Sequence, residues 1–392
     1  RYDEYLREHG FGGANPWELW ANSAEGDNGE LLSGWLLENS GRRARVPEEH
    51  SETPYLTRRC IEFIESVGDE PWLCHLSFLK PHWPYIVPAP YDDMYGTEDI
   101  IPVVRSVQEK ESPHPVYGAF QNQPVCRTYS DDKVRERVIP AYMALVKQID
   151  DQMGVLFDYL ERKNLFENTM IVFTADHGDY LGDHWMGEKD LFHEPSVRIP
   201  LIIYDPRTSA DVTRGTATDA LVESVDLAPT FLDFFGGEPC PHIIEGHSLS
   251  PLLNAQTDVP WREVAISEYD YATRRARLAL GVDQADARLV MARDRRWKYI
   301  YAYGFRPMLF DLENDPQELH DLGDDPAYAV ERERLHSVIF DWACRHHTRT
   351  TLSPQRIEKM SGREPPGIVI GCWDEAAARE RGIWPVVSPE LK

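Results

Sequence analysis

The stretch at 167–184, which reads ENTMIVFTADHGDYLGDH, constrains the fold more than any other part of the sequence. Its TMIVFTA portion is rich in β-branched and other apolar residues, which predicts a buried parallel strand. Polar residues gather directly after this portion, at 176–184. In open α/β sheets, ligands bind at the carboxyl ends of the strands. The sequence therefore predicts a functional site where this strand ends.

The segments around this strand predict an α/β fold. Apolar residues recur with helical spacing at 56–68 and at 138–163, and 200–206 has the composition of a second buried strand, followed by a helix at 224–237. Proline is tolerated in the first turn of a helix, so Pro140 predicts that the long helix begins close to it. We expect a mainly parallel sheet sandwiched by helices, which we assign to a main domain at 1–255.

The character of the chain changes after residue 255. Short apolar segments separated by turns predict a smaller antiparallel sheet, and a helix follows at 327–345. We therefore expect a C-terminal subdomain at 256–345. The remaining residues, 346–392, form an extended tail rich in Pro and aromatic residues, which we expect to contact another subunit.

Composition and charge limit the classes of partner. The 392 residues are 42% hydrophobic and 11% aromatic, enough for one large core with a smaller subdomain beside it. The formal net charge is −25 and no run of Lys and Arg is present, which argues against nucleic acid as a partner. No apolar run approaches the length of a membrane span, so no membrane partner is expected. An anionic substrate remains compatible, because a bound divalent cation can dominate the local field.

The cysteines are scattered singly, without a CxxC pair. We interpret them as mostly free thiols in a reducing compartment, which favours a cytoplasmic location. The sequence opens at Arg1 rather than Met, so we expect the true start, with any signal peptide, to lie outside it. The six cysteines are Cys60, Cys74, Cys126, Cys240, Cys344 and Cys372.

Asp176 and His177 are the candidate metal ligands. A carboxylate and an imidazole side by side at a strand end suit Zn²⁺, Mn²⁺, Fe²⁺ or Ca²⁺. The dipeptide alone equally describes a capping Asp beside a surface His, but the charged residues that crowd the following loop favour a metal site. Within that loop, Lys189 is the candidate cation for a substrate oxyanion, and the alternative is an ordinary surface lysine.

A second candidate region is the loop KPHWPYIVPAPY, which follows an apolar run of strand length at 71–79. Its prolines exclude a helix or a central strand, so Lys80 and His82 lie on a rigid loop directly after the expected strand. A histidine held in this way can give a proton to a leaving group or bind an anion, although it can also be a packed or solvated loop residue. Lys80 is the weaker candidate for substrate binding.

Three segments together resemble a known family. KPHWPYIVPAPY, FTADHGDYLGDHWMGEKDLFHEPSVRIPLIIYDP and RRWKYIYAYGFRPMLFDLENDPQELHDLGDDP occur in that order, and the tail PPGIVIGCWDEAAARERGIWP follows. From about residue 54 to the end, the chain resembles the sulfatase branch of the alkaline phosphatase superfamily. Within that branch it is most similar to the phosphonate monoester hydrolase and phosphodiesterase group.

The resemblance implies an alkaline phosphatase-like fold and a metal-dependent hydrolase of phosphonate monoesters and phosphate diesters. Asp176 and His177 would be two ligands of one divalent metal ion, Mn²⁺ first, with Zn²⁺, Fe²⁺ or Ca²⁺ as alternatives. Lys189 would contact the non-bridging oxygens, His82 would assist the leaving group, and Lys80 would bind substrate. The partners implied are a small phosphonate, phosphate or sulfate ester and further copies of the chain, in a homotetramer or a dimer.

The chain departs from the family in one respect. The family nucleophile is a Ser, or a Cys oxidised to formylglycine, in a C/S-x-P/A-x-R motif, and none of the six cysteines fits that motif. The resemblance therefore implies a formylglycine-type nucleophile outside this chain. Two other functions stay open: an arylsulfatase-type hydrolase of sulfate esters, and a non-catalytic binding or assembly subunit. Glu194 and Arg198 would form a structural pair that orients the loop.

Overall fold

The computed structural model describes residues 1–238, 244–345, 354–362 and 371–382. None of the helices in these ranges is both long enough and apolar enough to cross a membrane. The helices are α1 (Tyr2–Glu8), α2 (Glu52–Val67), α3 (Val107–Glu111), α4 (Pro115–Gln121), α5 (Pro124–Tyr129), α6 (Asp132–Arg162), α7 (Glu194–Val197), α8 (Leu227–Phe234), α9 (Ser250–Leu253), α10 (Arg275–Leu280), α11 (Ala329–Arg345), α12 (Pro354–Met360) and α13 (Glu375–Glu380). The strands are β1 (Ser23–Glu25), β2 (Leu31–Ser33), β3 (Ile171–Thr174), β4 (Leu201–Tyr204), β5 (Ala265–Asp270), β6 (Arg288–Arg293), β7 (Trp297–Ala302) and β8 (Met308–Asp311).

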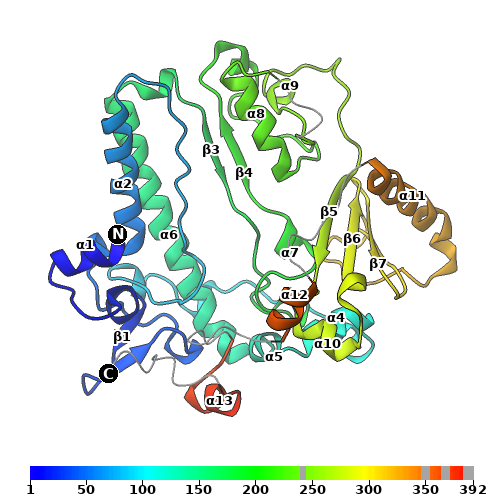
Figure 1. Cartoon of the computed structure of the whole chain (residues 1–392), viewed down its shortest axis with the longest axis horizontal. Helices are drawn as coiled ribbons and strands as arrows, with labels where there is room; N and C mark the ends of the chain where they lie inside the picture. The colour runs from blue at the N-terminus through cyan, green and yellow to red at the C-terminus, as the bar shows by residue number, and fades with distance from the viewer. Residues whose placement is uncertain (239–243, 346–353, 363–370, 383–392) are drawn as a thin grey trace.

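The helices predicted at 56–68 and 138–163 are formed as α2 and α6, which lie side by side (Figure 1). Cys60 and Ile64 of α2 are buried in one cluster with Leu156 and Leu160 of α6. In the view of Figure 1, these helices lie on one side of the β3–β4 pair and α8 lies on the other. The α/β class expected from the sequence is confirmed.

The start of α6 differs from the prediction, because the helix begins at Asp132, eight residues before Pro140. The Asp131 side chain caps it by accepting a 3.0 Å hydrogen bond from a backbone N–H of the first turn. Val134 and Val138 are 2% and 0% exposed. Burying two such side chains contributes about 1.5–3 kcal/mol each, which offsets the roughly 3 kcal/mol cost of an interior proline.

The strand pair β3–β4 lies where two strands were predicted, but its direction and burial differ from the prediction. The two strands run antiparallel, with Ile171 opposite Tyr204, and every pairing between named strands in the described residues is antiparallel. Phe173 is 36% exposed and Ile202 is 65% exposed. The expected parallel, buried arrangement is therefore wrong for this pair. β-branched composition reports that a segment fits a pleated surface, and says nothing of the direction of its neighbour.

The run at 71–79 is extended but pairs with no strand among the described residues, so the strand predicted there is not formed. Its exposure nevertheless alternates as in a strand: Leu73 and Leu79 are 64% and 41% exposed. Trp72, Cys74 and Leu76 instead pack against the α2–α6 cluster. The side chains thus have a strand's period of two, while the backbone lacks a partner.

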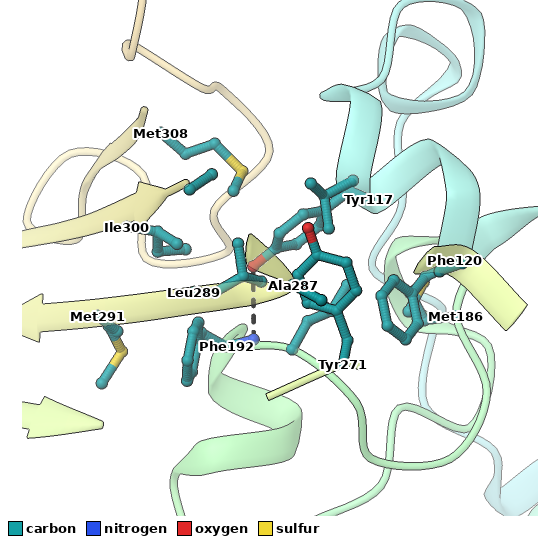
Figure 2. Close-up of a cluster of buried hydrophobic side chains, with 14 of the residues drawn as sticks. Tyr117, Phe120, Met186, Phe192, Tyr271, Ala287, Leu289, Met291, Ile300 and Met308 are labelled. Atoms are coloured by element: carbon teal, nitrogen blue, oxygen red, sulfur yellow. Dashed lines mark hydrogen bonds between the residues drawn. The ribbon is translucent and has the colours of Figure 1, made fainter. Parts of the chain in front are cut away.

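The predicted C-terminal antiparallel sheet is confirmed. Strands β5, β6, β7 and β8 form one sheet in that order, and α11 packs against β6 and β7. A buried cluster joins this sheet to α4 and to the loop that precedes α7, and Figure 2 shows side chains of all three parts in contact. In that cluster, the Phe192 backbone N–H donates a 3.4 Å hydrogen bond to the Tyr117 hydroxyl (Figure 2).

The described parts of the tail contact the chain itself. The Leu37 N–H donates to the Cys372 carbonyl (3.1 Å), and the Ser361 hydroxyl donates to the Ala272 carbonyl (3.0 Å). The tail's contact with another subunit stays a prediction. Four tail residues that the sequence singled out, Pro365, Pro366, Trp384 and Pro385, lie outside the described residues.

A buried lysine connects the C-terminal sheet, β5 to β8, to the segment at 192–198. Lys298 of β7 is 0% exposed, and its ammonium lies 2.8 Å from Glu194 Oε1 and 2.6 Å from Glu318 Oε1. It also donates a 2.8 Å hydrogen bond to the Phe192 carbonyl. The predicted pair of Glu194 with Arg198 exists at 4.0 Å, but Arg198 is 79% exposed, so Lys298 is the stronger partner.

Replacing Lys298 by Met should destabilise the fold by about 3–5 kcal/mol, because the buried Glu318 and the partly buried Glu194 would lose their shared cation. Urea unfolding followed by circular dichroism measures the change. The matched control is Lys133→Met, since Lys133 is exposed on α6 and its loss should change stability by less than about 0.5 kcal/mol. Equal unfolding midpoints for the two variants would contradict the role given to Lys298.

Candidate active site

The two predicted catalytic residues meet in the structure. Lys189 Nζ lies 3.2 Å from His82 Nε2, although the residues are 107 positions apart in the sequence. His82 lies on the predicted proline-rich loop, and Lys189 lies on the loop that leads from β3 to α7. The fold therefore brings the two candidate regions into one place.

The surroundings of His82 fix its tautomer and orientation. Its Nδ1 lies 2.8 Å from the Trp83 carbonyl, which can only accept, so Nδ1 carries the proton and the Nε2 lone pair faces Lys189. The ring stacks on Trp83, with centroids 5.6 Å apart and planes 8° apart. Burial lowers the pKa of His82, the hydrogen bond to Trp83 opposes this, and the positive charges of Lys189 and Lys80 lower the pKa further. The imidazole is therefore neutral near pH 7.

Asp176 and His177 present two bare acceptors to each other. His177 Nδ1 donates to the Gly178 carbonyl (2.8 Å), which leaves the Nε2 lone pair 3.4 Å from Asp176 Oδ2. Two facing acceptors repel unless a cation lies between them, and a metal ion about 2 Å from each donor fits a separation of this size. The His177 N–H donates to Asp176 Oδ1 (3.0 Å) and holds the carboxylate in this position. The donor set therefore fits a divalent metal.

Gly178 lets the chain pass close to α7 directly after these ligands. A Cβ at this position would lie 1.9 Å from the Pro195 carbonyl oxygen, so no other residue fits without moving the backbone. The Gly178 N–H donates to the Ser196 carbonyl (2.8 Å), and the Ser196 hydroxyl donates to the Lys189 carbonyl. Helix α7 thus fixes both the end of the loop beside the candidate metal ligands and the Lys189 end.

The loop between these ends has an unusual backbone. Five of the eight non-glycine residues with positive φ in the described chain lie within residues 181–191. Such conformations cost energy and persist where the surroundings determine them, often at functional sites. Here, buried side chains from the loop and its ends hold the backbone in these conformations. They are Tyr180, Met186, Leu191 and Phe192, which are at most 3% exposed. The five residues are Leu181, His184, Trp185, Glu188 and Leu191.

A second buried cluster, Glu109, His184 and His193, supports the same loop and was missed from the sequence. His184 Nδ1 lies 2.6 Å from Glu109 Oε1, and the two imidazoles stack with centroids 3.8 Å apart and planes 2° apart. Ligand atoms of all three lie within 4.8 Å of one another, so the cluster offers the donors of a metal site. Because the two imidazole rings are stacked and parallel, their nitrogen lone pairs lie side by side and do not converge on one point. This geometry suits packing of the rings better than coordination of one shared metal ion.

Lys80 occupies a different environment from Lys189. It is buried, and its ammonium donates to Asn22 Oδ1 (3.0 Å) and to the Pro84 carbonyl (2.5 Å). Burial lowers its pKa to about 8. These contacts brace the loop that carries His82, and a contact of Lys80 with substrate stays a prediction.

Asp179 is a further charged residue beside Lys189. Burial raises its pKa to about 7, and the nearby Lys189 charge opposes that rise.

A surface pocket of about 380 Å³ lies elsewhere, between α6 and the loops at 40–42 and 87–97, and none of the predicted site residues lines it.

Comparisons with known proteins agree with this geometry. The chain is 30% identical over 323 residues to the multifunctional alkaline phosphatase superfamily protein PehA of Trinickia caryophylli, covering 78% of this chain and 62% of that protein. It is 27% identical to an arylsulfatase of Clostridium perfringens, covering 82% of this chain and 64% of the relative. The chain thus spans less than two thirds of either relative.

Among solved structures, a phosphonate monoester hydrolase from Silicibacter pomeroyi superposes with a TM-score of 0.77 at 25% identity, over 88% of this chain and 69% of that one. The family model for the N-sulphoglucosamine sulphohydrolase C-terminal region matches residues 182–343. The sulfatase family model matches residues 4–237, which include His82, Asp176, His177 and Lys189. The chain belongs to the sulfatase family of the alkaline phosphatase superfamily.

Proposed function

We propose that the protein hydrolyses phosphonate monoesters and phosphate diesters with one divalent metal ion, Mn²⁺ by preference, and a formylglycine-type nucleophile outside this chain. The observation that carries the proposal is the 3.2 Å contact of Lys189 with His82 in the same site as the Asp176–His177 donor pair. Similarity to a structure named as a phosphonate monoester hydrolase supports the substrate class.

Lys189 binds the anionic group of the ester. Its ammonium is partly buried, and an electrostatic contact strengthens as water is excluded. The non-bridging oxygens gain negative charge as the nucleophile adds to phosphorus, so the contact stabilises the transition state more than the bound ester.

His82 assists the leaving group. Because Trp83 holds the proton on Nδ1, only Nε2 can exchange a proton with the ester. Nε2 takes up a proton from solvent and passes it to the leaving oxygen, while Lys189 keeps its ammonium charge for the anionic group. The lowered pKa of His82 makes the imidazolium a stronger acid than an exposed one, which favours that second transfer.

Asp176 Oδ2 and His177 Nε2 would hold the metal ion. A bound divalent cation neutralises the ester oxyanion and lowers the pKa of an attacking hydroxyl. Carboxylate and imidazole donors suit Mn²⁺, Zn²⁺, Fe²⁺ and, through oxygen, Ca²⁺.

We also propose that the enzyme is a homo-oligomer, a tetramer or a dimer, in which the tail contacts another subunit.

A second candidate is sulfate ester hydrolysis, because sulfate and phosphonate monoesters both present a singly charged tetrahedral group. Similarity to a relative named arylsulfatase favours it. A third candidate, a non-catalytic binding or assembly subunit, would keep the metal site without turnover.

The substrate class is tested with protein expressed from the complete reading frame and loaded with Mn²⁺. We expect kcat/KM for p-nitrophenyl esters of a phosphonate and of a phosphate diester to exceed that for the sulfate ester by about 10-fold or more. A higher value for the sulfate ester would establish the second candidate instead. Bound metal without turnover of any of the three would establish the third.

Lys189→Ala should lower kcat/KM by about 10²–10³, since one charge that stabilises the transition state is lost. Lys163→Ala is the matched control, because this exposed lysine contacts Glu65 at 4.0 Å and the Tyr159 ring, away from the site, and its loss should leave activity unchanged. Steady-state kinetics and thermal unfolding are measured on both variants. Unchanged kcat/KM in a folded Lys189→Ala variant would remove Lys189 from the mechanism.

Metal content separates the two candidate metal clusters. Asp176→Asn and His177→Ala should each lower the metal bound per chain by about 10-fold or more, measured by mass spectrometry after dialysis. Glu109→Gln should keep the metal, and so should His320→Ala, whose exposed ring forms a similar 3.3 Å pair with Asp315. Loss of metal in Glu109→Gln, with metal retained in Asp176→Asn, would move the ion to the buried cluster.

A further inference from the structure

Two cysteine thiols face each other beneath the segment that leads to His82. Cys60 of α2 and Cys74 of the extended run at 71–79 have their Sγ atoms 3.6 Å apart. Both belong to the apolar cluster formed by α2 and α6. Cys60 is 7% exposed, whereas Cys74 is partly exposed.

The other cysteines of the described residues lie apart from this pair. Cys126 is buried against Met186, Cys372 is buried against Leu36, and Cys344 is exposed on α11. The Cys60–Cys74 contact is therefore the one thiol–thiol contact that the described part of the chain contains.

Formation of a disulfide between Cys60 and Cys74 requires only a small structural change. A disulfide needs a sulfur separation near 2.05 Å, so the two atoms must approach by about 1.5 Å. The run at 71–79 belongs to no sheet ladder in the described residues, so a small shift of Cys74 breaks no ladder hydrogen bond there. The partner, α2, is a regular helix of 16 residues that is anchored against α6.

We propose that Cys60 and Cys74 form a redox-responsive pair that closes to a disulfide when a low-molecular-weight disulfide, such as oxidised glutathione, is the oxidant. The Cys74 thiolate attacks one sulfur of the oxidant, which releases one thiol and leaves a mixed disulfide on Cys74. The Cys60 thiolate then attacks the Cys74 sulfur and displaces the second thiol. The protein thiols lose two protons and two electrons, and the oxidant becomes two thiols.

The order of these steps follows from the surroundings of the thiols. The partly exposed Cys74 meets the oxidant first. Burial, helped by the neighbouring Cys74, raises the pKa of Cys60 to about 12, which makes it a poor first nucleophile. Once the mixed disulfide forms, the adjacent Cys60 has the advantage of proximity.

The disulfide would hold in place the segment of the chain that leads to the His82 loop. Cys74 lies eight residues before His82, so a Cys60–Cys74 link ties α2 to the segment that carries the His82 loop. A consequence of the bond for activity rests on the proposed function, whereas the bond itself does not.

Reduced protein is incubated with oxidised glutathione, alkylated, and digested after glutamate, which separates the two cysteines because Glu62 and Glu65 lie between them. We expect unreduced digests to contain the Cys60 and Cys74 peptides joined, and the oxidised protein to unfold at a higher temperature than the reduced protein. Cys60→Ser should stop at glutathione on Cys74, and Cys126→Ser should still form the link.

Two results would overturn the proposal. One is separate glutathione adducts on Cys60 and Cys74 in the unmutated protein without a joined peptide. The other is no reaction at either residue under conditions in which the exposed Cys344 is fully modified. Both are read from peptide masses, so they are independent of whether the protein hydrolyses phosphonates.

Discussion

The arrangement of the site depends on one buried charge, the Lys298 ammonium. An ammonium removed from water is costly unless carboxylates and carbonyls surround it, and Glu194, Glu318 and Phe192 provide that environment. Because Lys298 belongs to β7 and Glu194 begins α7, this contact joins the C-terminal sheet to the site loop. Ser196 of the same short helix then holds the Lys189 backbone. The position of the Lys189 ammonium is therefore set by a strand more than a hundred residues further along the chain.

The loop at 181–191 shows what this anchoring achieves. Its left-handed backbone conformations are unfavourable for residues with side chains, and each costs of order 1–3 kcal/mol. The buried stack of His184 on His193, closed by Glu109, offsets part of that cost from one side. The aromatic and aliphatic cluster of Figure 2 offsets it from the other. A loop held in this way loses little further entropy when a ligand binds, which is what a preorganised anion site requires.

The sequence indicated the loops that carry the candidate site residues more reliably than it indicated the direction of the strands beside them. Prolines fix the loop that carries His82, and polar residues after a strand mark Asp176 and His177, so both were visible locally. The contact of His82 with Lys189 is a tertiary contact that was not predicted, although the family resemblance gave both residues a role toward one substrate. The direction of β3 against β4 escaped prediction because β-branched composition carries no directional information.

Other features were missed because their signals are ordinary. Glu109 sits in a short polar helix, and its one local signature is a capping box with Ser106, which points to a helix start rather than to a buried histidine partner. The early start of α6 was missed because proline was given more weight than the packing of Val134 and Val138. In both cases a long-range contact outweighed a local rule.

The close approach at Gly178 has a consequence for how sequences of such proteins are compared across evolution. The Pro195 carbonyl leaves no space for a side chain at this position, so selection against every other amino acid acts there through sterics alone. An invariant glycine beside Asp176 and His177 would score as highly in an alignment as these two candidate metal ligands. Its invariance would record the path of the backbone, and a relative that kept the glycine but had lost both ligands would have inherited the shape of the site without its chemistry.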